Sequence, residues 1–183
     1  MKKLESTWYN MAVVLTLISV IAAAALAYVN EQTKGPIADI QQRNEAQAIK
    51  TVLCDDNAVV TDTIVNGDVV VYVTDNGAAV KTTDPQNGSF GGGLTIMVGL
   101  DPEFRVLGYT VLLSNETPGL GAKAGEWFQK GGKGDIIGRT AGQLAATKDG
   151  GEVDAITAST ITTRSFLRAV NNAYAEYAKV INK

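Results

Sequence analysis

The residues with the clearest chemical potential lie at 154–163, Asp-Ala-Ile-Thr-Ala-Ser-Thr-Ile-Thr-Thr, directly before a helical pattern. Small side chains here let a phosphate approach closely, and the first N–H groups of the following helix point outward as donors. A negatively charged phosphodiester is favoured at that end of a helix. Threonine is a weak nucleophile, and the chain has no histidine to activate one. Thr160 is therefore predicted to be an attachment point that another enzyme modifies.

A second segment with chemical meaning follows a predicted strand and consists of Glu116, Thr117, Pro118, Gly119, Leu120 and Gly121. Pro118 and Gly119 predict a rigid turn. Gly119 and Gly121 allow the backbone to contact a flat ring, because glycine carries no side chain that would keep the ring away. Glu116 or Thr117 can meet the polar edge of such a ring. The segment therefore predicts a surface that receives a planar ligand.

Together the two segments resemble the FMN-binding domain shared by the G subunit of the Rnf complex and the C subunit of the sodium-pumping NADH:quinone oxidoreductase. The flavinylation motif of that family runs Asp, two variable positions, Ser or Thr, Gly, Ala, Thr. Asp154, Thr157 and Thr160 occupy the matching positions with the same spacing. Ala158 stands where the family has Gly and disfavours a positive φ. Ser159 stands where the family has Ala and offers a rival hydroxyl.

The resemblance implies FMN, esterified through its phosphate to Thr160 by a separate flavin transferase that uses FAD. It implies a cofactor site made of Asp154, Thr157, Ala158, Ser159, Thr160 and Ile161 with Glu116, Thr117, Pro118, Gly119, Leu120 and Gly121. Lys123 either neutralises phosphate or is a solvated surface lysine. Trp127 either covers the ring or is a core aromatic. No catalytic residue and no metal ligand is predicted.

The composition limits which partners and cofactors this chain can bind. The chain has 183 residues and a formal net charge of −3, so a nucleic-acid partner has little electrostatic support. The lack of histidine removes the usual axial ligand of haem, and the single cysteine excludes an iron–sulfur cluster, a c-type haem attachment or a disulfide held by this chain alone. Cys54 is expected to be a small buried apolar residue. If the protein carries electrons, a flavin fits these limits, because the cofactor supplies the electron chemistry.

An apolar run at 11–29 predicts a transmembrane helix. At 1.5 Å per residue it reaches about 28 Å, close to the hydrocarbon thickness of a bilayer. Trp8, Tyr9 and Tyr28 lie where aromatic side chains favour the membrane interfaces. A cleaved signal peptide is the alternative, because Ala25-Leu26-Ala27 resembles a cleavage site, but the apolar run is longer than the usual signal core.

The charges around this run predict its orientation. Lys2 and Lys3 precede it, whereas Asn30 and Glu31 follow it. The positive-inside rule therefore keeps the N-terminus in the cytoplasm and exports the rest of the chain, as a periplasmic or extracellular domain on the inner (cell) membrane. No second long apolar run follows, so this chain alone builds no path for ions across a bilayer.

The remaining pattern predicts one α+β domain with a twisted, mainly antiparallel sheet and flanking helices. Gly35-Pro36 marks the exit from the membrane, and an amphipathic helix follows with Ile37, Ile40, Ile49, Val52 and Leu53 broadly on one side. Strands are expected at 69–73, 78–81, 94–98 and 106–113. The triple glycine at 91–93 is interpreted as a loop or strand entry. A short helix is expected around Trp127 and Phe128, and a closing helix at about 163–180 presents Phe166, Val170, Tyr174, Tyr177 and Ile181 to the core.

The predicted organisation is a cytoplasmic N-terminus at 1–10, the transmembrane helix at 11–29, an amphipathic linker helix at 30–54 and the FMN-binding domain at 55–183. The resemblance implies an electron relay in an ion-translocating ferredoxin:NAD oxidoreductase, a redox-driven ion translocase whose complete active site is not in this chain. Its expected partners are the other membrane and redox subunits, the flavin transferase and membrane lipid. The short length favours the Rnf subunit over the quinone-reductase relative. A non-redox anchored sensory or interaction domain is the alternative from another class.

Overall fold

The computed structural model describes residues 7–181 and begins with one long helix, α1 (Trp8–Leu53). Gly35 and Pro36 lie inside this helix, so the expected punctuation after the apolar run does not end it. Within the described residues, α1 is the one helix long and apolar enough to cross a membrane, by length and composition. Lys2 and Lys3, on which the predicted orientation depends, lie outside the described residues.

The chain forms two compact units, Met1–Arg43 and Asn44–Lys183. The C-terminal end of α1, from Asn44 onward, therefore belongs to the second unit. This end carries the buried apolar residues of the predicted amphipathic helix, Ile49, Val52 and Leu53, whereas Ile37 and Ile40 are exposed. The predicted apolar stripe is thus buried only over its last turns, which are the ones that meet a sheet.

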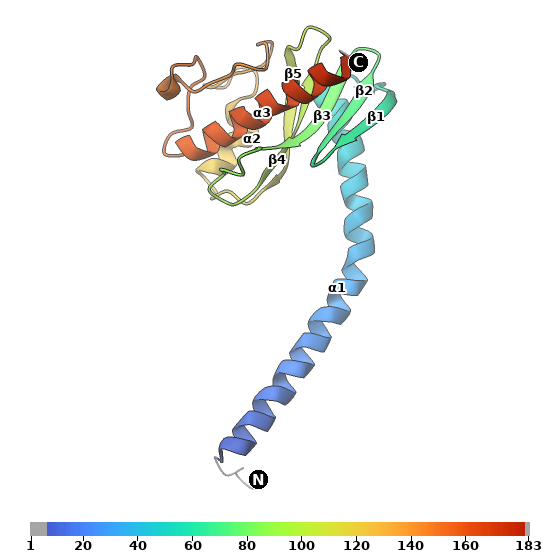
Figure 1. Cartoon of the computed structure of the whole chain (residues 1–183), viewed down its shortest axis with the longest axis vertical. Helices are drawn as coiled ribbons and strands as arrows, with labels where there is room; N and C mark the ends of the chain where they lie inside the picture. The colour runs from blue at the N-terminus through green and yellow to red at the C-terminus, as the bar shows by residue number, and fades with distance from the viewer. Residues whose placement is uncertain (1–6, 182–183) are drawn as a thin grey trace. The chain divides into compact units, whose positions relative to one another are not determined.

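The second unit is built on a five-stranded antiparallel sheet in which each strand pairs with the next along the chain (Figure 1). The strands are β1 (Val60–Asn66), β2 (Val69–Thr74), β3 (Gly77–Thr83), β4 (Leu94–Leu100) and β5 (Val106–Ser114). The predicted strands correspond to β2 through β5. The edge strand β1 was not predicted, because its side chains are mostly exposed and give no apolar alternation.

The two faces of the sheet are covered by the two helices at the ends of this unit. The C-terminal helix α3 (Thr160–Ile181) packs on one face, where Val80 and Val98 meet Phe166 and Val170. The end of α1 packs on the other face, against Ala79 and Met97. Neighbouring residues of one strand thus serve opposite cores, as the period of two requires. The predicted α+β class is confirmed.

The end of α1 approaches the sheet at a pair of facing glycines. Gly99 of β4 lies opposite Gly108 of β5 in the ladder. A Cβ on Gly99 would lie 2.1 Å from the carbonyl oxygen of Val52, and one on Gly108 would lie 2.9 Å from the same oxygen. No side chain fits between this strand pair and the helix backbone, so the two glycines set how closely α1 docks.

Some local predictions need correction. Cys54 is exposed, with a φ of 53° in the residue that follows α1, so the expectation of a buried thiol was wrong. Helix α3 begins at Thr160, three residues before the predicted start, and its last apolar residue, Ile181, is exposed. The short helix α2 (Ala124–Trp127) lies where a helical segment was predicted. Most of the segment between α2 and α3 is irregular and carries only the 3₁₀ helix η2 (Thr147–Asp149).

Candidate functional site

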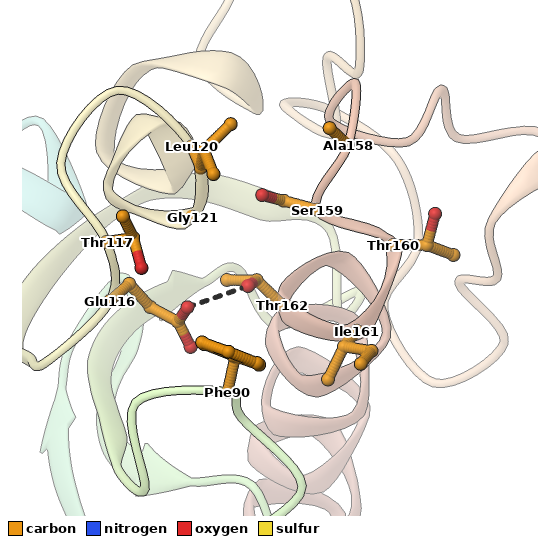
Figure 2. Close-up of a pocket in the computed structure, with 10 residues that line it drawn as sticks. All are labelled: Phe90, Glu116, Thr117, Leu120, Gly121, Ala158, Ser159, Thr160, Ile161 and Thr162. Atoms are coloured by element: carbon orange, nitrogen blue, oxygen red, sulfur yellow. Dashed lines mark hydrogen bonds between the residues drawn. The ribbon is translucent and has the colours of Figure 1, made fainter.

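An open pocket of about 380 Å³ lies between the start of α3 and the two loops that flank β4 and β5. Figure 2 shows the ten residues that line it, Phe90, Glu116, Thr117, Leu120, Gly121, Ala158, Ser159, Thr160, Ile161 and Thr162. The two predicted segments therefore meet at one site. The pocket combines exposed apolar side chains with one carboxylate and four hydroxyl groups, a lining suited to a flat ligand that has polar edges.

Glu116 joins three segments beneath the pocket. Its side chain is buried, and its Oε2 accepts a hydrogen bond of 2.9 Å from the Thr162 hydroxyl (Figure 2). Its Oε1 accepts a 3.3 Å bond from the backbone N–H of Gly91. A Cβ on Gly121 would lie 2.4 Å from Glu116 Oε2, so only glycine fits there. Glu116 thus positions the loop 116–121 against α3, rather than pointing freely at a ligand.

The start of α3 is fixed by a tight turn. The N–H of Ser159 donates to the carbonyl of Ile156, and Ala158 adopts a φ of 61° within this turn. The buried Thr163 hydroxyl donates to the Ser159 carbonyl and accepts from the N–H of Ile156, both at 3.0 Å. The positive φ appears at the position where the resembling family carries glycine, so Ala158 is strained in the way that glycine avoids.

Ala158→Gly is expected to stabilise the folded chain by about 0.5 kcal/mol. Removing the Cβ relieves about 1 kcal/mol of strain from the left-handed backbone conformation. The greater conformational freedom of glycine in the unfolded chain offsets part of this stabilisation. Thermal unfolding of the full chain in detergent measures the difference. The matched control is Ala122→Gly at an exposed residue of the 3₁₀ helix η1 (Gly121–Lys123), where the same change is expected to destabilise. A loss of stability in Ala158→Gly as large as in the control contradicts the strain.

Thr160 and Ser159 differ in accessibility and direction. Ser159 is 8% exposed, and its hydroxyl points toward the loop 116–121 (Figure 2). The half-buried Thr160 lies at the rim of the pocket, and its side chain points away from Glu116. The Nζ of Lys148 donates to Thr160 Oγ1 at 3.3 Å. Of the two hydroxyls, that of Thr160 is the one that a second protein can reach.

Phe90 forms an apolar wall of the pocket that was not predicted. It exposes 74% of its surface and lines the same pocket as the exposed apolar residues Leu120 and Ile161. The loop that carries Phe90 is anchored by Asp84, whose carboxylate accepts bonds of 2.9 and 2.6 Å from the guanidinium of Arg168 on α3. Asp84 also accepts from the N–H groups of Gln86 and Gly88.

These bonds make Asp84 a pH-dependent anchor. Burial raises its pKa, but the bonds from Arg168 and from two backbone N–H groups outweigh burial and bring the pKa down to about 2. A depressed pKa contributes stability that is present above the unfolded value of 3.8 and is lost as the pH falls through the folded value.

Asp84→Asn is therefore expected to lower the free energy of unfolding by about 2 kcal/mol at pH 7, and the difference from the unsubstituted chain shrinks between about pH 4 and pH 2. Urea unfolding of both chains across this pH range measures the difference in their free energies of unfolding. The exposed Asp56 provides the control, because Asp56→Asn removes the same charge without an anchor. A pH-independent difference between Asp84→Asn and the unsubstituted chain contradicts this account.

Several predicted site residues do not line the pocket: Asp154, Thr157, Pro118, Gly119, Lys123 and Trp127. The indole N–H of Trp127 donates to the carbonyl of Asp154 at 2.9 Å, so Trp127 fastens the segment before the motif. Phe90, Thr162 and Lys148 are the contributors that sequence reasoning missed. The triple glycine next to Phe90 was the available signal, because the N–H of Gly91 donates to Glu116 and a Cβ on Gly91 would lie 2.2 Å from the Asn115 carbonyl oxygen.

Comparison with known proteins identifies a family. Residues 89–175, which include every residue that lines the pocket, match the FMN-binding domain family. The G subunit of the Na⁺-translocating ferredoxin:NAD⁺ oxidoreductase complex of Acetobacterium woodii is 29% identical, with 96% of each chain covered. The G subunit of the ion-translocating oxidoreductase complex of Methanosarcina acetivorans is 30% identical, with 90% of this chain and 91% of the relative covered.

A third relative is more similar over a shorter stretch. The G subunit of the ion-translocating oxidoreductase complex of Yersinia pestis is 38% identical over 100 residues, which cover 52% of this chain and 47% of the relative. The expected resemblance is therefore confirmed both at the level of the domain that holds the pocket and along nearly the whole chain. By this similarity, the chain belongs to the G-subunit family of ion-translocating oxidoreductase complexes.

Proposed function

We propose that this chain is a membrane-anchored electron-transfer subunit of an ion-translocating ferredoxin:NAD oxidoreductase complex and carries FMN bound covalently to Thr160. The observation that supports this most is the position of the accessible Thr160 hydroxyl on the rim of the pocket that the FMN-binding match spans. One apolar helix, α1, serves as a single-pass anchor. The domain from Asn44 onward then faces the periplasm or the cell exterior.

The residues of the pocket fit FMN. The pocket has a volume of about 380 Å³, which lies in the range of small-molecule sites. Phe90, Leu120 and Ile161 offer apolar surface for the isoalloxazine ring, and the hydroxyl of Thr117 can meet a polar edge. Gly121 keeps the floor of the pocket low, because a larger residue would collide with Glu116 and Thr162.

Attachment requires a phosphoryl transfer at Thr160. The hydroxyl oxygen of Thr160 attacks the FMN phosphorus of FAD, an O–P bond forms, and the bond from that phosphorus to the AMP phosphate breaks. AMP leaves with the electron pair, and the threonine proton passes to the solvent or to the flavin transferase. The turn at 156–159 holds Thr160 at the rim, where the transferase can reach it.

Once bound, FMN supplies the chemistry of accepting and passing electrons one at a time. The chain itself binds and orients the group. Thr160 prevents its dissociation, which matters outside the cytoplasm, and the open pocket leaves a face of the ring near the surface for another protein of the complex. The site that this chain contributes to the relay is therefore the flavin pocket and its rim.

The test is to co-express the full chain with a flavin transferase, denature it and examine the gel band under ultraviolet light. A covalently bound flavin stays with the denatured polypeptide and fluoresces, whereas a chain made without the transferase is expected to be dark. A dark band in both samples contradicts the proposed function and favours a non-redox anchored domain. If the fluorescent chain instead co-purifies with subunits of a sodium-pumping NADH:quinone oxidoreductase, the chain is the C subunit of that complex.

A further inference from the structure

Lys148 lies beside the hydroxyl oxygen of Thr160, although Lys148 belongs to none of the segments predicted to form the site. Its Nζ donates to Thr160 Oγ1 at 3.3 Å. Lys148 belongs to η2, and Gly150, which caps the C-terminal end of η2, has a φ of 85°. The N–H of Asp149 donates to the Ala146 carbonyl at 2.8 Å, and the N–H of Gly151 donates to the same carbonyl at 3.0 Å. The backbone that presents Lys148 is therefore a closed turn.

The neighbour of Lys148 ties this turn to α3. Asp149 accepts two hydrogen bonds from Arg164, at 2.7 and 2.5 Å. Arg164 follows Thr160 by about one helical turn, so the ion pair fastens η2 directly over the start of the helix. The pair also offsets the charge of Arg164. Lys148 forms no ion pair within residues 7–181, and its ammonium group donates to Thr160 Oγ1.

We propose that Lys148 is the counter-charge for a phosphodiester on Thr160. This rests on the proposed attachment of FMN at that residue. A phosphodiester carries one negative charge at neutral pH, and the ammonium group beside the ester oxygen donates to a non-bridging oxygen. Lys148 orients the threonine hydroxyl before attachment and holds the phosphate after it. Lys123, the lysine singled out from the sequence, does not line the pocket.

The first experiment measures the rate of attachment. The full chain in detergent is incubated with purified flavin transferase and FAD, and the intact mass is followed with time. Lys148→Gln is expected to slow the mass increase about tenfold, a loss of about 1.4 kcal/mol in the transition state. Lys148→Arg, which keeps the charge, is expected to restore most of the rate. The exposed Lys130, changed to Gln, is the matched control and is expected to leave the rate unchanged.

The second experiment separates phosphate binding from recognition by the transferase. Melting temperatures are compared for four forms: the unsubstituted chain and Lys148→Gln, each with and without attached FMN. The comparison is analysed like a double-mutant cycle, with the attachment in place of the second substitution. The unmodified forms are expected to melt together, because an exposed lysine contributes little to stability. The modified Lys148→Gln form is expected to melt several degrees below the modified unsubstituted chain, and the gap is expected to narrow at high salt.

The outcomes are distinguishable. If the unsubstituted chain gains no mass, the proposed function fails and this inference fails with it. If the unsubstituted chain is modified but Lys148→Gln matches it in both rate and melting temperature, only the role of Lys148 is overturned. If Lys123→Gln reproduces the loss and Lys148→Gln does not, the counter-charge is Lys123.

Discussion

Thr160→Val is expected to leave the chain with no covalently bound flavin. Valine has nearly the shape of threonine but lacks the hydroxyl, so the start of α3 is preserved while the oxygen that forms the ester is removed. The half-buried position makes the cost of this change in folding small. In-gel fluorescence and intact mass, both on chain co-expressed with the flavin transferase, measure the result. The expected effect is complete loss of both signals.

Ser159→Ala is the matched control for Thr160→Val. It removes the rival hydroxyl, which is buried and directed toward the loop 116–121, and it installs the residue that the resembling family carries. Fluorescence is expected to persist at its full level. The reverse pattern, with signal in Thr160→Val and none in Ser159→Ala, reassigns the acceptor to Ser159.

Gly99→Val is expected to lower the free energy of unfolding by about 3 kcal/mol. A Cβ at this position would lie 2.1 Å from the carbonyl oxygen and 2.6 Å from the carbonyl carbon of Val52. Both are backbone atoms at the buried end of α1, so the clash is relieved only by moving the helix off the sheet. Urea unfolding of the full chain in detergent measures the change.

Gly93→Ala provides the comparison for Gly99→Val, because a Cβ at Gly93 meets no atom within 4 Å. It is expected to change the free energy of unfolding by less than about 0.5 kcal/mol. Gly99→Ala is expected to fall between the two. A Gly99→Val chain as stable as Gly93→Ala would mean that α1 does not dock through this glycine pair.

The sequence predicted those parts of the fold whose signal is local. The hairpins from β2 to β5 follow from alternating apolar residues and turn residues such as Asn76-Gly77. Parts of both predicted segments line one pocket, Glu116, Thr117, Leu120 and Gly121 from the first and Ala158, Ser159 and Thr160 from the second. That these residues hold a cofactor stays a prediction. The strain at Ala158 also follows from the motif, since the turn demands a positive φ whichever residue occupies it.

The remaining features depend on contacts that are distant in sequence. Phe90 and Lys148 reach the site only because Asp84 pairs with Arg168 and Asp149 pairs with Arg164. No periodicity in a single sequence encodes such pairs. Cys54 was misjudged for a related reason: a thiol is usually buried, but this residue directly follows α1 with a positive φ, and its side chain is exposed. Trp127 was left open between covering the ring and packing in the core; it packs against the core, and its indole N–H also donates to the Asp154 carbonyl.

The most direct test of covalent attachment is peptide mapping by mass spectrometry of the chain purified from the cells that naturally make it. The peptide containing residues 154–164 is expected to gain the mass of one FMN less one water, and fragmentation is expected to assign this gain to Thr160. If the same peptide is found only at its unmodified mass, in protein from cells that make the flavin transferase, Thr160 does not carry FMN.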